Sequence, residues 1–385
     1  MNIAFFNQNA LIQREVVTAL RKFPGVHVIA IDIQTHPVAA QAQQVVSILG
    51  NHGCEMVITI NEWGIDDSGI IWEYCDSHKI AHINWTVDDP FFEEIVHRKK
   101  YRPSKYRIDF VSDKGYLEPM RTQGYSVHFL PLATDLSLFH PPPDLSHPRD
   151  LDVVFVGNSY LKQIDSFLRM APGFIDTLVP FLGEVVSSYL ADVDFDVEGT
   201  IEEKLRKKKI PADLTYEKAC FIAKHAAGYF GRKRMITSLA ERFRGFMVYG
   251  DAGWKQDIPE HRLGTAKYYD SLCEVYQRAR ITIDINRMVI RNGFTQRVFD
   301  APACGSLVIT GKKQVVDESF TVDGEMRDVV VFDSLDTLHD AVNYYLLHDN
   351  ERAAVAQRGM NTVFRRHTYD HRINEMFTMV KRSGV

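Results

Sequence analysis

The sequence predicts an α/β protein built from two Rossmann-like domains, each with a parallel β-sheet, and a helical insertion early in the second domain. Three observations predict this fold class. The chain has 385 residues, too many for one ordinary core and suited to two domains of about 150–200 residues each. Short apolar runs alternate with amphipathic stretches of helical length, which is typical of βαβ units. Between two such series lies a proline-rich segment, residues 140–150, which predicts an interdomain linker.

The first predicted domain spans residues 1–139. Its apolar runs predict strands over residues 3–6, 26–31, 56–60, 81–85, 108–112 and 127–132. Amphipathic stretches over residues 14–23 and 38–53 predict helices. Because helical stretches separate consecutive strands, the strands are expected to lie parallel in a doubly wound sheet.

The second predicted domain spans residues 151–368 and opens with a strand over residues 151–158. The sequence then reads as mostly helical up to residue 243, which is the predicted insertion. Alternation resumes with strands over residues 246–251, 281–286, the end of the segment 291–310, and 328–332, and with helices over residues 268–280 and 335–349. Two further amphipathic helices close the chain, the last of them within residues 369–385.

Composition excludes several classes of protein. The chain is 45% hydrophobic and 25% charged, as in ordinary globular proteins. Its 45 basic and 50 acidic residues give a net charge of −5, which argues against a nucleic-acid binder. The five scattered cysteines lack C-x-x-C spacing and favour a reducing cytoplasm. The first residues read as a strand and not a signal peptide. No apolar stretch was expected to reach the ~20 residues of a membrane span.

The predicted binding residues follow the strands. Ligands of open α/β sheets bind at the carboxyl ends of the strands, and two such sheets facing each other are expected to form a cleft. In the second domain, the loops after the strands contain Gly157, Asn158, Tyr249, Gly250, Asn286, Arg287, and residues 291–296. In the first domain, they contain residues 7–9, 61–63 and 85–90.

The segment RNGFTQRVFDAPACGSLVIT, residues 291–310, carries the most specific pattern. Gly293 allows close approach to a ligand, and Thr295 is a suitable N-cap for a helix that begins QRVF. Free N–H groups of residues 295–297, with Arg297 beside them, would then form an anion site suited to a diphosphate. Asp300, one turn further, would accept both hydroxyls of the attached ribose. The alternative is that Asp300 only caps the helix or pairs with Arg297.

Two acidic residues, Asp88 and Asp89, follow the strand at residues 81–85. Either could act as the general base that deprotonates an acceptor hydroxyl. The alternative is a cap for the helix that begins at Pro90, and one of the two is expected to have that role. His82 on the preceding strand is expected to be packed and not catalytic.

Other polar motifs carry weaker signals. Residues 231–234, Gly-Arg-Lys-Arg, precede a predicted helix and would either clamp donor phosphates or form a solvated helix entry. Residues 204–209 are basic and read as solvated surface. Residues 192–194 match a D-x-D metal motif but lack a preceding strand. The fifteen histidines show no ligand spacing, and no metal is predicted.

These motifs resemble a known family. The chain carries QRVFDAPACGSLVIT, preceded by ITIDINR and followed by VVVFDSLDTLHDAVNYYLLHDNERAAVAQRG and HTYDHR, and its first half contains NWTVDDP. These sequences resemble the CgeB-like, spore-maturation-protein-like glycosyltransferases of the group 1 GT-B superfamily. The resemblance covers most of the chain, least over residues 160–240.

The resemblance implies a GT-B fold, with the acceptor bound by the N-terminal domain and the nucleotide-sugar donor by the C-terminal one. It also implies a final helix, residues 369–385, that crosses back to the first domain. The implied activity is metal-independent transfer of a sugar, a hexose in the leading interpretation, from a nucleotide-diphosphate donor to a sugar, lipid-linked or protein acceptor. No cofactor is expected beyond that donor, with a UDP-sugar favoured. The donor residues predicted from the loops after the strands and from the segment 291–310 are Gly157, Asn158, Tyr249, Gly250, Asn286, Arg287, Asn292, Gly293, Phe294, Thr295, Gln296, Arg297 and Asp300.

One departure from the family pattern leaves the stereochemistry open. Retaining group 1 enzymes carry two glutamates eight positions apart, and this chain has Asn292 and Asp300 at those positions. Asp300 keeps a carboxylate for the ribose, whereas Asn292 supplies no negative charge near the sugar. Two other functions remain open at this point: a nucleotide-sugar 2-epimerase of the same fold, and a non-catalytic nucleotide or sugar binder.

Overall fold

The computed structural model describes the whole chain except residues 93–94, 96–101, 145–147 and 385. The contacts divide the chain into two compact units. The first unit contains Met1–Asp135, Arg291–Gly293 and His367–Val385, and the second contains Leu136–Ile290 and Phe294–Arg366. The chain therefore enters the first unit three times. The expected linker, residues 140–150, lies in the second unit where it is described, and residues 145–147 of it lie outside the described part.

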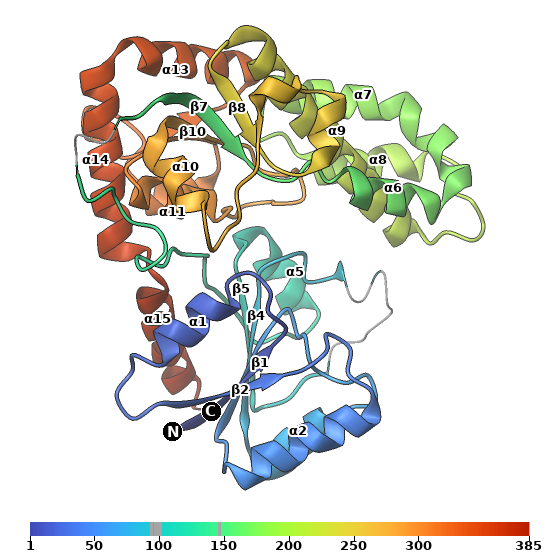
Figure 1. The fold of residues 1–385 in the computed structure, drawn as a ribbon. Helices are drawn as coiled ribbons and strands as arrows, with labels where there is room; N and C mark the ends of the chain where they lie inside the picture. Colours follow the sequence, from blue (N-terminus) through green and yellow to red (C-terminus); the bar gives the residue numbers. More distant parts are fainter. Residues whose placement is uncertain (93–94, 96–101, 145–147, 385) are drawn as a thin grey trace. The chain divides into compact units, whose positions relative to one another are not determined.

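The first unit is built on a parallel sheet of six strands in the order β2-β1-β3-β4-β5-β6 (Figure 1). The strands are β1 (Asn2–Asn7), β2 (His27–Asp32), β3 (Met56–Ile60), β4 (Ala81–Thr86), β5 (Arg107–Val111) and β6 (Val127–Phe129). The described helices of the N-terminal segment are α1 (Gln13–Leu20), α2 (Ala39–Asn51), α3 (Ile70–His78) and α5 (Leu117–Thr122). All residues of β3, β4 and β5 are buried, as expected for central strands covered on both faces.

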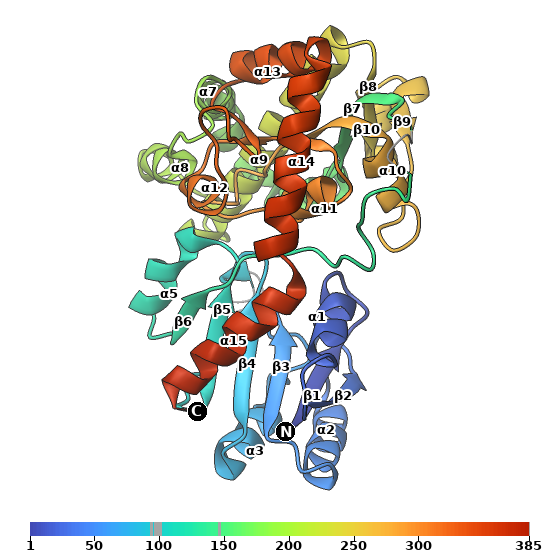
Figure 2. The same cartoon turned by 90° about the vertical axis from the view of Figure 1, so that its left-hand side faces the viewer.

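The last helix, α15 (Tyr369–Ser383), packs against α1 in this first unit (Figure 2). The Thr368 hydroxyl caps its first turn by accepting the N–H of His371. Tyr369 lies edge-on to Trp85 of β4, and Phe377 lies edge-on to Phe23. Arg372, only 2% exposed, donates from Nε to the carbonyl of Pro131 at 2.8 Å. The C-terminal residues are thus part of the core of the first unit.

The second unit is built on a parallel sheet in the order β12-β11-β10-β7-β8-β9. Its strands are β7 (Leu151–Val156), β8 (Phe246–Tyr249), β9 (Leu263–Gly264), β10 (Ala279–Asp284), β11 (Leu307–Gly311) and β12 (Val330–Phe332). The two-residue β9 was not expected from the sequence. Its helices are α6 (Leu161–Arg169), α7 (Ile175–Ala191), α8 (Val197–Arg206), α9 (Tyr216–Arg242), α10 (Leu272–Arg278), α11 (Arg297–Ala303), α12 (Gln314–Ser319), α13 (Leu335–Leu347) and α14 (Asp349–Arg366).

The helical insertion contains α6 to α9, and the first three of these helices pack against α9. Helix α9 is 27 residues long and is capped by the Thr215 hydroxyl, which accepts the N–H of Lys218. Small residues line its buried face, among them Gly228 and Gly231. A Cβ at Gly231 would clash with the side chain of Met288. The glycines therefore allow α9 to lie close to the loop that follows β10.

One stretch corrects an expectation about membrane spans. Pro172–Ala191, which includes α7, is 20 residues long and apolar enough to cross a membrane by length and composition. No such stretch was expected from the sequence. Leu178, Phe181 and Val185 are buried within the protein, and core helices meet the same criterion, so this is weak evidence for a membrane span.

Candidate donor site in the second unit

The order of strands in the second unit places a switch point between β7 and β10. From β7 the chain continues to β8 and β9 on one side, and it then returns to β10, β11 and β12 on the other. The loops after β7 and β10 therefore diverge at neighbouring strand ends, which is where open α/β sheets bind ligands. Gly157 and Asn158 directly follow β7, and Asn286 and Arg287 follow β10. Topology thus brings four of the sequence-predicted residues to one sheet edge.

Three arginines from different elements converge beside this edge. Arg232 comes from α9, Arg287 from the loop after β10, and Arg297 from the first turn of α11. Two aromatic rings hold them: the guanidinium carbons of Arg287 and Arg232 lie 4.7 and 5.1 Å from the centre of the Tyr160 ring. Those of Arg232 and Arg297 lie 4.8 and 5.1 Å from the centre of the Phe155 ring. We call Arg232, Arg287 and Arg297 the arginine cluster.

The charges of the arginine cluster affect one another. Burial, together with the neighbouring Arg297, lowers the pKa of Arg232 to about 10. Burial opposes ionisation of Tyr160, yet the positive charges of Arg287, Arg232 and Arg297 outweigh it and hold the pKa of Tyr160 below its usual value. Both pKa values respond to the same two influences: burial, and the positive potential of the neighbouring arginines. A bound anion would relieve this potential.

Two glycines at this edge, Gly157 and Gly250, lie so close to neighbouring atoms that a side chain would not fit. A Cβ on Gly157 would overlap the Nη2 atom of Arg232. Gly157 is also fixed by its neighbours, since its N–H donates to the carbonyl of Tyr249 at 2.8 Å and its carbonyl accepts from Trp254 Nε1 at 2.8 Å. A Cβ on Gly250 would overlap that same carbonyl. Gly157 therefore leaves room for the Arg232 guanidinium group, and Gly250 leaves room for the Gly157 carbonyl.

Asp284, at the end of β10, was missed by the sequence analysis. Its carboxylate is fully buried and accepts from the Thr295 hydroxyl at 2.6 Å and the Thr310 hydroxyl at 2.9 Å. It also forms an ion pair with Arg297. The only feature of the sequence that could have indicated Asp284 is an acidic residue at the end of an apolar strand. Asp284 therefore compensates one arginine and ties the loop before α11 to the sheet.

These contacts correct two expectations for the segment 291–310. Helix α11 begins at Arg297, and its N-cap residue is Gln296 with no side-chain cap. Thr295 is thus not the N-cap, because its hydroxyl donates to Asp284. The alternative in which Arg297 pairs with Asp300 is also wrong, since Arg297 pairs with Asp284.

Asp300 lies in the first turn of α11 and is 1% exposed. Its Oδ2 atom accepts from the Tyr268 hydroxyl at 3.2 Å, and that hydroxyl accepts from Gln296 Nε2 at 2.5 Å. A tyrosine and a glutamine thus orient the carboxylate. Its role as a ribose ligand stays a prediction.

Two other predicted residues have buried positions. Phe294 packs against Phe299 and Phe320, with ring centres 5.1 and 6.2 Å away, so its ring belongs to the core. Asn286 is 5% exposed, and its Oδ1 atom has no hydrogen-bond partner among the described residues. A buried polar atom without a partner is costly, so Asn286 is a suitable place for a ligand donor group to bind.

Asn292 and Gly293 belong to the first unit and not to the second. The buried carboxylate of Asp113 accepts the backbone N–H of Arg291 at 2.7 Å and of Asn292 at 2.8 Å. A Cβ on Gly293 would crowd Asp113. The glycine is thus explained by its approach to Asp113, and the backbone N–H of Asn292 is already hydrogen-bonded.

The candidate base residues lie in the first unit, in the loop after β4, which is the neighbour of β3 in the sheet. In the loop after β3, Asn61 and Glu62 both have positive φ, 55° and 56°. Asn61 Nδ2 donates to Asp88 at 2.9 Å, whereas Asp89 accepts the backbone N–H of Phe91 at 3.0 Å. Asp89 therefore has the capping role, through its bond to the N–H of Phe91, and Asp88 is the more exposed of the two aspartates.

The remaining motifs have local roles. His82 is buried, contacts the Thr59 hydroxyl at 2.9 Å and lies against Trp72, so it is packed as expected. Residues 231–234 lie inside α9, so they do not precede a helix as expected. Lys204 and Lys207 pair with Glu184 and Glu203 on the surface. Among the residues that the structure describes, no group of three or more His, Cys, Asp and Glu side chains is arranged to hold a metal.

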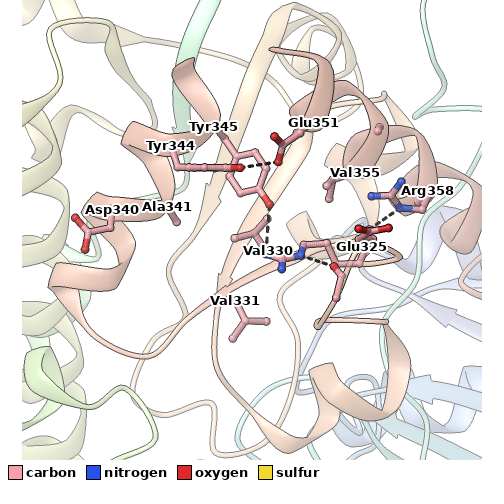
Figure 3. A pocket seen from close by; sticks show the side chains of 13 residues that line it. Glu325, Val330, Val331, Asp340, Ala341, Tyr344, Tyr345, Glu351, Val355 and Arg358 are labelled. Carbon is pink, nitrogen blue, oxygen red and sulfur yellow. Dashed lines mark hydrogen bonds between the residues drawn. The ribbon is translucent and has the colours of Figure 1, made fainter. Parts of the chain in front are cut away.

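A cavity of about 950 Å³ opens between β12, α13 and α14 (Figure 3). None of the predicted donor residues lines it. Its polar groups contact one another: the Tyr344 hydroxyl donates to Glu351 at 2.6 Å, and Arg358 Nε donates to the carbonyl of Arg327 at 2.8 Å. The arginine cluster, and not this cavity, is therefore the candidate functional site.

Comparison with known proteins gives a family match to part of the chain and a match of the fold. A family model described as glycosyl transferase-like matches residues 232–378, which include Arg232, Arg287, Arg297 and Asp300. Curated protein sequences give no match. The crystal structure of Anabaena Alr3699/HepE in complex with UDP-glucose aligns with a TM-score of 0.57 at 9% identity, covering 98% of this chain and 100% of that one. A glycosyltransferase from Rickettsia africae aligns with a TM-score of 0.54 at 10% identity, covering 99% and 98%.

At such low identity, the structural likeness establishes the fold alone. The resemblance to CgeB-like members stays a prediction. The chain has the two-sheet α/β fold of the GT-B glycosyltransferases, and its residues 232–378 match the glycosyl transferase-like sequence family.

Proposed function

We propose that this protein is a glycosyltransferase that moves a sugar, a hexose in the leading case, from a nucleotide-diphosphate donor to an acceptor hydroxyl without a metal ion. The arginine cluster carries this proposal. It gathers three guanidinium groups at the switch point of the second sheet, beside Gly157 and one helical turn from Asp300. In a metal-independent reaction, such cations neutralise the leaving diphosphate.

The donor would span the switch point. Arg232 and Arg287 would contact the diphosphate. Arg297, whose guanidinium group is oriented by the ion pair with Asp284, would donate further hydrogen bonds to it. Asp300 would accept the ribose hydroxyls. A UDP-sugar is favoured, because Alr3699/HepE was solved in complexes with UDP-glucose and with UDP and glucose. The cytoplasm suits such a donor and the free cysteines.

The acceptor would be a sugar, lipid-linked or protein hydroxyl bound by the first unit. Asp88 would remove its proton, because Asp89 is engaged in capping Phe91. Asn61, which donates to Asp88, would hold the carboxylate in position. A base of this kind contributes about 10²–10⁴-fold to the rate.

Binding of UDP and of uridine, measured by titration calorimetry, tests the donor site. UDP is expected to bind at least tenfold more tightly than uridine, because only UDP reaches the arginine cluster. In Arg232→Met this difference should shrink, since a charge-assisted hydrogen bond is worth about 1.5–3 kcal/mol. Lys233→Met is the matched control: Lys233 is the next residue of α9 and pairs with Asp257 at 2.7 Å. Equal affinity for UDP and uridine in the wild type would refute the diphosphate site.

Turnover of the bound donor tests the reaction class. A UDP-sugar that is a true donor should be hydrolysed slowly to UDP and sugar in the absence of acceptor, and EDTA should not alter the rate. Conversion of the donor to an epimer without UDP release would instead identify an epimerase. Tight binding with no turnover in the presence of acceptor mixtures would identify a binding protein.

A further inference from the structure

Two cysteines of the second unit lie in contact behind the donor site. Cys273 belongs to the first turn of α10, and Cys304 is the C-cap residue of α11. Their Sγ atoms are 3.7 Å apart. Cys304 is fully buried, whereas Cys273 is partly exposed. Cys273 is therefore the member of the pair nearer to solvent, and the sulfur of the buried Cys304 lies next to its own.

The surroundings favour a thiolate on Cys273. Gln277 Nε2 donates to its sulfur at 3.4 Å. The hydrogen bond with Cys304 is the main cause that lowers the pKa of Cys273 to about 6, against the effect of burial. Burial raises the pKa of Cys304. Either sulfur can be the donor in the contact between the two cysteines, and the protonated Cys273 thiol can also donate to the carbonyl of His140 at 3.7 Å. The lower pKa makes Cys273 the attacking thiolate, and the neighbouring Cys304 thiol is placed to resolve it.

We propose that Cys273 and Cys304 form a peroxide-reactive dithiol that closes to an intramolecular disulfide. The Cys273 thiolate attacks one oxygen of a hydroperoxide, the O–O bond breaks, and the leaving oxygen takes up a proton. The Cys273 sulfenic acid is then attacked by Cys304, whose proton passes to the departing hydroxide to give water. The two sulfurs lose two electrons in total, and the peroxide gains them.

The geometry requires only a short movement. A disulfide has an S–S length of about 2.0 Å, so the two sulfurs must approach by less than the width of one atom. Helices α10 and α11 already pack against each other. The new bond would join α10 to the helix that carries Arg297 and Asp300. Oxidation would therefore act on the framework of the candidate donor site.

The other cysteines provide an internal contrast. Cys54 and Cys75 are also neighbours, but both are buried in the core of the first unit. Burial raises the pKa of Cys54, and burial with the charge of Asp76 raises the pKa of Cys75 to about 12. Cys220 is partly exposed, and burial raises its pKa to about 11. Peroxide is thus expected to select Cys273.

The test uses the reduced protein of 385 residues and does not depend on nucleotide binding. After treatment with hydrogen peroxide at neutral pH, the protein is unfolded and its thiols are alkylated. Three of the five cysteines should be alkylated, and peptide mapping should find Cys273 joined to Cys304 in a monomer. Dithiothreitol should restore all five thiols.

Variants separate the two sulfurs. Cys304→Ala should stop the reaction at a sulfenic acid on Cys273, which dimedone traps, and Cys273→Ser should abolish the cross-link. Cys220→Ser is the control and should react like the wild type. Five free thiols after peroxide treatment of the wild type, or a cross-link between any other cysteines, would overturn the proposal. Both outcomes can be read even if a variant folds poorly, and neither bears on whether UDP binds.

Discussion

Arg232 is a buried charge that lies beside two other guanidinium groups. Its hydrogen-bonding partner is the phenol of Tyr160, whereas the buried carboxylate Asp284 compensates Arg297. Its pKa of about 10, lowered by burial and then by Arg297, means that its charge costs the free protein stability below pH 10. Such a residue is better explained by ligand binding than by folding.

The free Arg232→Met protein is therefore expected to melt no lower than the wild type, while its UDP affinity falls. A pKa lowered by folding corresponds to a charge that favours the unfolded state, and this cost is present at neutral pH and fades as the pH rises above 10. Thermal melts at pH 7 with and without UDP measure both effects. A large loss of melting temperature in the free variant would make Arg232 a structural residue.

The buried carboxylate of Asp300 is expected to contribute to UDP binding. Asp300→Ala should weaken UDP binding by about tenfold to a hundredfold, as expected for loss of a charge-assisted hydrogen bond of 1.5–3 kcal/mol. Asp300→Asn should cost less, since the amide keeps one acceptor. Tyr268→Phe is the matched control, because it removes the hydroxyl that contacts Asp300 and leaves the carboxylate. Lower melting temperature with unchanged UDP affinity would show that Asp300 is structural.

Asp88 and Asp89 allow a test with adjacent residues. Asp88→Asn should lower kcat by 10²-fold or more, the usual scale for a general base, with donor affinity unchanged. Asp89→Asn should keep most of kcat and lose stability instead, because the Asp89 carboxylate accepts the N–H of Phe91. Steady-state kinetics and thermal melts of both variants decide this. Equal kcat in Asp88→Asn and the wild type would remove Asp88 from the mechanism.

At the scale of elements, the positions of the strands other than β9 and of the longer helices followed from the sequence. Apolar runs predicted β3 at its observed bounds, residues 56–60, because a buried parallel strand is apolar on both faces. The N-cap of α11 could not be predicted from the sequence in the same way. Thr295 has the chemistry of an N-cap, but its hydroxyl binds Asp284, which is eleven residues earlier in the chain. Local preferences cannot reveal such a partner.

The members of the arginine cluster also could not all be predicted from local sequence. Arg287 and Arg297 were found because they lie in loops or helix starts after strands. Arg232 was placed before a helix by the sequence, whereas it lies within α9. It reaches the site because Gly231 lets α9 approach Met288, and a glycine inside a helix is not by itself a signal for packing. Long-range contacts thus decided the composition of the site.

Cys273 on α10, in contact with Cys304 at the end of α11, is expected to react with a thiol reagent in a pH-dependent way. Alkylation of Cys273 by iodoacetamide should be half-maximal near pH 6, where its pKa lies, and should fall about tenfold for each unit below that. In Cys304→Ala the midpoint should move upwards, because the main cause of the lowered pKa, the hydrogen bond with Cys304, is lost. Mass spectrometry of the peptide that contains Cys273 measures the rate. A midpoint near 8.5 in the wild type would contradict this prediction.

At the scale of the whole molecule, the chain builds two sheets with separate cores, and α15 completes the first. The proposed donor contacts with Arg232, Arg287 and Arg297 all lie in the second unit. Arg372 holds α15 to the first unit, donating to the carbonyl of Pro131 and bonding to His367 at 2.8 Å. Donor binding and the attachment of α15 should therefore respond to different substitutions.

Arg372→Met should destabilise the first unit and leave UDP affinity within about twofold of the wild type. The substitution leaves buried carbonyl groups without their donor, which costs about 1–3 kcal/mol for each. Hydrogen exchange should accelerate in β4 and α15, but not in β7 and β10. Lys22→Ala is the control: it removes only the exposed pair of Lys22 and Asp370 at 2.9 Å, and such pairs contribute about 0–1 kcal/mol. Loss of UDP affinity in Arg372→Met comparable to that in Asp300→Ala would mean that the two units are energetically coupled in the donor-free protein.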